Sequence, residues 1–140
     1  MSEKYTLSSL LSRLSEFEST LSQIYDELSR ETADRELKHM LTEYASKSKV
    51  RANELESIKE FVIELALEPI TGIELNSYIN RIKETASKKD ISVRDRVKEI
   101  ELNIKELYSQ ISSKIKHISG EASYLLDRYV KEASERISKL

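Results

Sequence analysis

The sequence predicts an all-α protein: an antiparallel four-helix bundle with a long crossover, containing a short helix, between the second and third long helices. Two observations predict this fold class. The 140 residues include two glycines, one proline and no tryptophan, and 34% are charged, which is typical of long solvated helices. Apolar residues also recur at steps of three and four along four stretches, the spacing of one helix face. We therefore expect a single domain over residues 1–140, with a first hairpin at about 6–68, a crossover at about 69–92 and a second hairpin at about 93–140.

The first hairpin begins with a helix expected from Thr6 to about Arg30. Its apolar stripe consists of Leu7, Leu10, Leu11, Leu14, Phe17, Leu21, Ile24, Tyr25 and Leu28. Thr6 or Ser8 is expected to cap its start, because a hydroxyl at this position accepts from free backbone N–H groups. The stripe lapses before Asp34, which is a good N-cap for the next helix.

The second helix is expected to run to about Glu68, where Pro69 stops it. Its stripe consists of Leu37, Met40, Leu41, Tyr44, Ala45, Ser48, Ala52, Leu55, Ile58, Val62 and Leu65. Only a few residues separate the first two helices, which favours an antiparallel hairpin.

The crossover and the second hairpin follow the same pattern. Ile73, Leu75, Tyr78, Ile79 and Ile82 predict the short helix of the crossover. A third long helix is expected from near Ser92, with Val93, Val97, Ile100, Ile104, Leu107, Tyr108, Ile111 and Ile115 on its stripe. Gly120 is expected to mark the following turn as a left-handed C-cap. The fourth long helix carries Ala122, Leu125, Leu126, Tyr129, Val130, Ala133, Ile137 and Leu140.

The two hairpins repeat each other. Helices one and three align without a gap at an offset of 83 residues, and helices two and four align at an offset of 85. The change of offset falls in the hairpin loop, where a length change is tolerated. The matched positions include Glu18 and Glu101, Tyr25 and Tyr108, Tyr44 and Tyr129, Ser48 and Ala133, and Arg51 and Arg136. Because polar residues recur inside the apolar stripe, a duplicated hairpin is favoured over coincidental periodicity.

The repeated Glu and Tyr lie seven residues apart, which places them on one face of a helix. With Ala45, Ala52 and Leu55 on the second helix, this pattern resembles the ferritin-like superfamily, most closely its rubrerythrin-type members. In that family each hairpin carries the Glu and Tyr on its first helix and Glu-x-x-His on its second, and the two hairpins together hold two irons. The resemblance covers roughly residues 10–58 and 93–140 and implies a ferritin-like bundle.

The sequence departs from the family at the metal ligands. Ser48 and Arg51 stand where the family has the Glu and His of the first hairpin, and Ala133 and Arg136 stand there in the second. Arginine stays charged and has no lone pair to donate to a metal. The two histidines, at 39 and 117, lie outside the motif and are expected at the surface or at loop edges. We therefore expect no metal, no other cofactor and no catalytic residue.

The substitutions suggest a pairing hypothesis. Glu18 would pair with Arg51, and Glu101 with Arg136, inside the bundle, so that each guanidinium balances the charge that a metal would balance. Hydrogen bonds to the carboxylates are expected from Tyr25 and Tyr108, with Tyr44 and Tyr129 as further candidates. In the alternative interpretation each Arg extends outward from the edge of the stripe and each Glu is solvated.

Composition and charge limit the partners and the location that can be expected. The net charge of −2 gives no reason to expect nucleic acid or an anionic membrane as a partner. The chain has no cysteine and no run of about 18 apolar residues. Its first residues lack the features of a secretion signal, so we expect a cytoplasmic protein. A basic stretch is interpreted as a solvated charged segment rather than a contact surface: Arg81, Lys83, Lys88, Lys89, Arg94, Arg96 and Lys98.

Three functions remain open at this point. The first is a non-catalytic binding or assembly protein that has lost its di-iron site; the resemblance implies a homodimer, and a protein partner is not identified. The second is a divergent rubrerythrin-like iron-binding oxidase or peroxidase. Its carboxylates would come from Glu16, Glu43, Glu99, Glu106, Glu132 and Glu135. The third is a helical adaptor or coiled-coil protein unrelated to ferritins.

Overall fold

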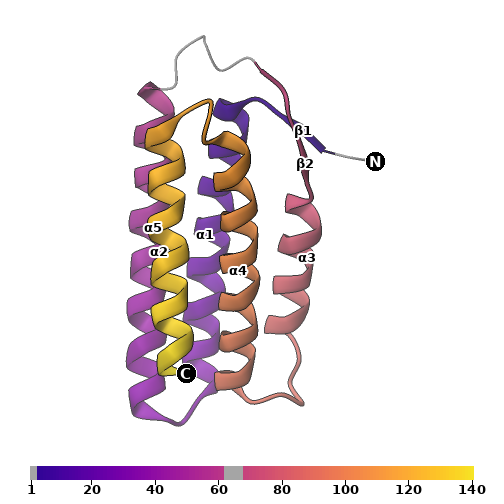
Figure 1. Cartoon of the computed structure of the whole chain (residues 1–140). Coiled ribbons are helices and arrows are strands. Elements are labelled where there is room, and N and C mark those ends of the chain that lie inside the picture. The colour runs from indigo at the N-terminus through magenta and orange to yellow at the C-terminus, as the bar shows by residue number, and fades with distance from the viewer. Residues whose placement is uncertain (1–2, 62–67) are drawn as a thin grey trace.

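The computed structural model describes residues 3–61 and 68–140, and this part of the chain is mostly helical (Figure 1). The helices are α1 (Leu7–Glu31), α2 (Arg35–Phe61), α3 (Leu75–Ala86), α4 (Val93–Ile115) and α5 (Gly120–Lys139). Two short strands, β1 (Glu3–Tyr5) and β2 (Ile70–Ile73), complete the described elements. The predicted helical class is therefore confirmed in its main feature.

The helices pack lengthwise in pairs. Helix α1 packs along α2, helix α4 packs along α5, and α3 lies on the outer side of α4 (Figure 1). The chain returns along α3 after the first pair, so α4 begins at the opposite end of the bundle from α1 (Figure 1). As a result, the two matched helices α1 and α4 run in opposite directions, and side chains at matched positions can approach each other from opposite ends.

The prediction of an all-α protein is wrong in one respect, because β1 and β2 form a two-stranded antiparallel sheet. Glu3 pairs with Ile73, and Tyr5 pairs with Ile70. The side chains of Ile70 and Ile73 are buried, which ties the start of the crossover to the core. Strands of three and four residues are too short to show a period in the sequence, so this sheet had no detectable signal.

Side-chain caps start α1, α2 and α4 at the residues where the sequence predicts a helix start. At α1 the cap is Thr6 rather than Ser8: the Ser9 N–H donates to Thr6 Oγ1 at 3.1 Å, and the Thr6 N–H donates to Ser9 Oγ at 2.9 Å. This reciprocal pair is a capping box. Asp34 Oδ1 accepts from the first backbone N–H groups of α2, and Ser92 caps α4.

The expected role of Gly120 is wrong. It is the first residue of α5 and has no left-handed backbone, while Ser119 caps the helix. The chain turns after α4 through ordinary right-handed geometry, with the N–H groups of Ile118 and Ser119 donating to the carbonyl of Ile115. Among the described residues the left-handed glycine is Gly72 in β2, with φ of +79°. The predicted end of the second helix near Glu68, with Val62 and Leu65, depends on positions 62–67, which are outside the described residues.

The crossover contains the short helix that the sequence predicts. A buried arginine, Arg96, holds the loop that joins this helix to α4. Arg96 donates to the carbonyl oxygens of Ile91 (2.9 Å) and Ala86 (3.0 Å), and its Nη1 lies 3.1 Å from Glu31 Oε1. The Arg96 side chain is only 4% exposed. The basic stretch is therefore not a uniformly solvated segment, because one of its arginines is a structural clamp.

One hydrophobic core runs through the helices and both strands contribute to it. The stripes predicted for the first and third long helices are completely buried. The other two are mostly buried over the described residues, with Met40 and Ile58 of the second stripe and Val130, Ile137 and Leu140 of the fourth partly exposed. Within residues 3–61 and 68–140, no helix combines the length and the apolar character needed to cross a membrane.

Candidate functional site

Two carboxylates lie inside this core. Glu18 of α1 and Glu101 of α4 are both 0% exposed, because they lie in the apolar stripes of their helices, next to Phe17 and Ile100. A buried ionised carboxylate is very unfavourable unless charges and hydrogen bonds compensate it. The surroundings of these two groups therefore define the candidate site.

Each carboxylate accepts a hydrogen bond from the tyrosine of the other hairpin. The Tyr108 hydroxyl donates to Glu18 Oε2, and the Tyr25 hydroxyl donates to Glu101 Oε2. Both tyrosines are completely buried. The seven-residue Glu and Tyr pairs are thus not partners within one helix; each Glu is bound by the Tyr of the opposite copy, and the two bonds join α1 to α4 twice.

The arginines approach the carboxylates from the second helix of each hairpin. Arg136 Nη1 donates to Glu101 Oε1 at 3.1 Å. Arg51 Nη1 lies 3.9 Å from Glu18 Oε1, within ion-pair distance but too far for a hydrogen bond. The other end of the Arg51 guanidinium, Nη2, donates to Glu132 Oε1 on α5 at 2.7 Å. The two halves of the site are therefore related but not identical.

Each guanidinium also lies over an aromatic ring of the opposite hairpin. The Arg51 guanidinium carbon is 4.5 Å from the centroid of the Tyr129 ring, and that of Arg136 is 4.1 Å from the Tyr44 ring. Such contacts are favourable when the cation is desolvated. The Tyr129 hydroxyl donates to Glu54 Oε1 at 2.9 Å. All eight repeated polar residues therefore belong to two crossed networks. The Glu18 network contains Glu18, Arg51, Tyr108, Tyr129, the Arg51 partner Glu132 and the Tyr129 partner Glu54; the Glu101 network contains Glu101, Arg136, Tyr25 and Tyr44.

The electrostatics of the Glu18 network are uneven. Burial raises the pKa of Glu18 above its ordinary value, although Arg51 and Tyr108 act in the opposite direction. Burial also opposes ionisation of Glu132, but the hydrogen bond and charge of Arg51 lower the pKa of Glu132 below its ordinary value. The pKa of Arg51 is raised, because the attraction of Glu18 and Glu132 outweighs burial. The opposite shifts of the two carboxylates follow burial, because Glu18 is completely buried whereas the side chain of Glu132 is 24% exposed.

The tyrosines remain hydrogen-bond donors. Burial, together with the neighbouring carboxylates, raises the pKa values of Tyr25 and Tyr108 well above the ordinary value. Both hydroxyls therefore keep their protons at all ordinary pH values.

The di-iron centre that the family resemblance implies does not fit these residues. Each buried carboxylate faces a guanidinium, which cannot ligate a metal. Among the described residues, no three His, Cys, Asp or Glu side chains are grouped so that they could hold a metal ion. His39 and His117 are 76% and 64% exposed and lie beside Glu43 and Glu68. Their positions therefore do not suit ligands of a metal inside the bundle.

Glu132 and Glu54 are members of the network that sequence reasoning missed. The sequence points to Glu132 only as one candidate carboxylate of the iron-binding oxidase alternative. A signal was present, because the repeat reverses the charge at both positions: Lys47 matches Glu132, and Lys139 matches Glu54. Lys47 Nζ lies 3.9 Å from Glu132 Oε2. Glu54 in turn pairs with Arg128 of α5, so both missed carboxylates lie where α2 and α5 face each other.

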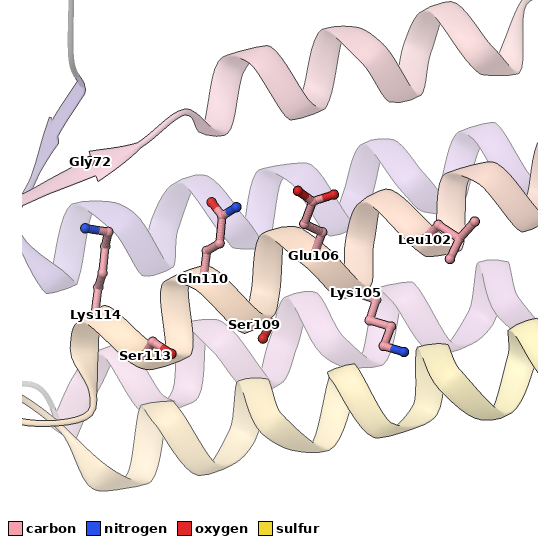
Figure 2. Close-up of a pocket in the computed structure, with 8 residues that line it drawn as sticks. All are labelled: Gly72, Leu102, Lys105, Glu106, Ser109, Gln110, Ser113 and Lys114. Atoms are coloured by element: carbon pink, nitrogen blue, oxygen red, sulfur yellow. The ribbon is translucent and has the colours of Figure 1, made fainter.

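An open groove runs over the outer face of α4 (Figure 2). Its volume is about 1100 Å³. Figure 2 shows Glu106, Gln110 and Lys114 pointing toward the side of β2 and α3, while Lys105 points the other way. The residues that line the groove are all exposed. It therefore contains none of the buried charge that distinguishes the two networks.

Comparison with protein families, with curated proteins and with solved structures found no match to this chain.

Proposed function

We propose that this chain is a ferritin-like four-helix bundle that has lost its di-iron site, is not an enzyme, and acts as a binding or assembly protein. One observation carries the proposal: the guanidiniums of Arg51 and Arg136 lie beside Glu18 and Glu101, at the positions where the family resemblance would place metal-ligating histidines. A permanent positive charge beside each carboxylate opposes the binding of a dication there.

The networks suit a structural role. The Glu18 network includes side chains from α1, α2, α4 and α5, and so does the Glu101 network. Apolar contacts tolerate small slips between helices, whereas hydrogen bonds between buried charged groups have defined geometry and are costly to break. In this proposal the networks fix the register of the two hairpins, and the outer helix surfaces are left for a partner.

A double-mutant cycle in each hairpin tests this role. Glu18→Ala and Glu101→Ala are each expected to destabilise the fold by about 3–5 kcal/mol, because a buried guanidinium loses a partner. Adding Arg51→Leu or Arg136→Leu removes the orphaned charge, so each double variant should be much less destabilised than the sum of its single variants. The coupling should be larger for Glu101 and Arg136, which touch at 3.1 Å, than for Glu18 and Arg51 at 3.9 Å. Additive free energies in denaturant unfolding would contradict the proposal.

Iron titration separates the proposal from a divergent iron oxidase or peroxidase. The wild-type protein should bind no stoichiometric ferrous iron, as measured by absorption spectra and metal analysis after desalting. A variant with Ser48→Glu, Arg51→His, Ala133→Glu and Arg136→His restores the ligands that the resemblance predicts, and it should bind two irons. Tight iron in the wild type supports the oxidase instead. A folded variant that binds no iron argues against the ferritin-like arrangement.

Light scattering tests the predicted assembly. The resemblance implies a compact homodimer of about twice the 16.2 kDa chain mass. An elongated or larger particle would favour the alternative of a coiled-coil adaptor. The cytoplasmic location stays a prediction, and cell fractionation is the measurement for it.

A further inference from the structure

We propose that the first hairpin holds one internal water molecule, bound to Ser48 Oγ, Glu18 Oε1 and Arg51 Nη1, and that the matching place in the second hairpin is dry. This site is independent of the function proposed above, because it depends only on the local hydrogen-bond chemistry of the Glu18 network.

The first argument is the placement of unsatisfied polar atoms. Among the described residues, four buried side-chain atoms lack a hydrogen-bond partner in the protein: Glu18 Oε1, Ser48 Oγ, Arg51 Nε and Arg51 Nη1. They belong to three side chains, each 0% exposed. An unsatisfied buried polar atom costs about 1–3 kcal/mol, and most native proteins satisfy nearly all of them. Their concentration at one place indicates a small polar ligand.

The second argument is the chemistry of these atoms. The ligand must accept a hydrogen bond from the guanidinium and donate one to the carboxylate, and it must also bond to a hydroxyl. A simple anion cannot donate to Glu18, and a metal cation cannot accept from Arg51. Water does both, and internal waters typically make about three hydrogen bonds.

The distances agree with a bound water. Arg51 Nη1 and Glu18 Oε1 are 3.9 Å apart, so a point beside the line that joins them lies about 2.9 Å from both atoms. The Ser48 hydroxyl is close enough to lower the pKa of the Glu18 carboxyl, yet its present geometry is not that of a direct hydrogen bond. Ser48 and Arg51 therefore both lie next to the Glu18 carboxylate without a direct hydrogen bond to it.

The repeat provides an internal comparison. In the second hairpin Ala133 stands at the position of Ser48, so the hydroxyl is missing. There Arg136 Nη1 bonds directly to Glu101 Oε1 at 3.1 Å, and no side-chain atom of Glu101 or Arg136 is buried without a partner. The hairpin with the Ser48 hydroxyl therefore has the longer Arg51–Glu18 distance, and the hairpin without it has a direct Arg136–Glu101 hydrogen bond.

Crystal structures that resolve ordered water test the proposal. In the wild type we expect one water within about 2.7–3.2 Å of all three atoms, and none between Arg136 and Glu101. In Ser48→Ala the water should be lost, and the distance from Arg51 Nη1 to Glu18 Oε1 should shorten from 3.9 Å toward the 3.1 Å of the second hairpin. Ser22→Ala is the matched control, because Ser22 is also buried but its hydroxyl donates to the Ala45 carbonyl at 2.8 Å; this variant should keep the water.

The wild-type crystals decide the question even if a variant does not fold. A direct bond from Arg51 Nη1 to Glu18 Oε1 with no water beside Ser48 would overturn the proposal, and so would electron density too strong or too large for one water molecule.

Discussion

Arg51 lies between two carboxylates that hold their protons differently. The pKa of Glu18 is raised, chiefly by burial, whereas the pKa of Glu132 is lowered by its hydrogen bond to Arg51 despite partial burial. The same guanidinium lies beside both carboxylates, so the difference follows burial, which is complete for Glu18 and partial for Glu132. At the scale of single residues, this inequality gives the stability of the protein two opposing pH dependences.

The two contributions have opposite signs. A raised folded-state pKa means that Glu18 stabilises the fold fully below its unfolded pKa of about 4.3, and this contribution is lost as the pH rises through the folded pKa. The contribution of Glu132 is present above that unfolded pKa and is lost as the pH falls through its lowered folded pKa. The wild type should therefore lose stability through Glu18 as the pH rises above about 4.3, and Glu18→Gln should abolish this loss. It should lose stability through Glu132 as the pH falls below about 4.3, and Glu132→Gln should abolish that loss.

Urea unfolding at a series of pH values measures both effects against the wild type. The unfolding free energy of Glu18→Gln should fall less steeply with rising pH, and that of Glu132→Gln should fall less steeply with falling pH. If both variants change the slope in the same direction, the opposite pKa shifts of Glu18 and Glu132 are wrong.

The sequence identifies most residues of the networks but not their connections. Glu18, Tyr25 and Arg51 could be selected because polar residues repeated inside an apolar stripe are unusual. The crossed pairing of each Tyr with the opposite Glu depends on the antiparallel placement of α1 and α4, which no local pattern encodes. Glu132 could not be selected in this way, because it lies off the apolar stripe and its contact with Arg51 forms only when α2 and α5 face each other.

At the scale of elements, Gly72 is the position where β2 depends on glycine. Its φ of +79° lies in the left-handed region, where a Cβ costs about 1–2 kcal/mol. An added Cβ would also come within 2.7 Å of Lys114 Nζ, the flexible end of a side chain that can move aside. Gly72→Ala should therefore destabilise the protein by about 1–2 kcal/mol in thermal or denaturant unfolding.

Gly120→Ala is the matched control. Gly120 has no left-handed backbone, and nothing lies within 4 Å of an added Cβ. This variant should change the unfolding free energy by no more than about 0.5 kcal/mol. Equal losses in the two variants would show that backbone conformation at Gly72 is not the cause.

Arg96 fastens the loop between α3 and α4 to the end of α1. Arg96→Ala would leave the carbonyl oxygens of Ala86 and Ile91 without their donor and should destabilise the fold by about 1–3 kcal/mol. Arg94→Ala breaks an exposed pair with Asp34 at 3.4 Å, and it should cost less stability, because solvent screens an exposed ion pair. Chemical denaturation compares the two variants; a larger loss for Arg94→Ala would contradict the clamp.

The elements themselves differ in how well the sequence predicts them. The starts of α1, α2 and α4 were predictable because Thr6, Asp34 and Ser92 carry a local signal, an oxygen placed before an apolar stripe. The strands were not, because β1 and β2 are held by pairing with each other and by buried isoleucines rather than by a repeating pattern. Gly120 misled the prediction, since a glycine near a helix end is common at C-caps and does not by itself specify one.

At the scale of the whole molecule, the crossed networks join all four long helices. The reversal of α4 relative to α1 brings Glu18 to Tyr108 and Glu101 to Tyr25, so that each hairpin completes the hydrogen bonds of the other. Neither hairpin alone can satisfy its own buried carboxylate in this way. Under the proposal of a bundle that has lost its di-iron site, the networks give the two retained glutamates a structural role.

X-ray diffraction at the iron absorption edge, from crystals soaked in ferrous iron, tests this account most directly. The account predicts no anomalous peak beside Glu18 or Glu101, with Arg136 Nη1 still bonded to Glu101 Oε1. An iron atom ligated by Glu18 or Glu101, with the guanidiniums of Arg51 and Arg136 displaced, would contradict it.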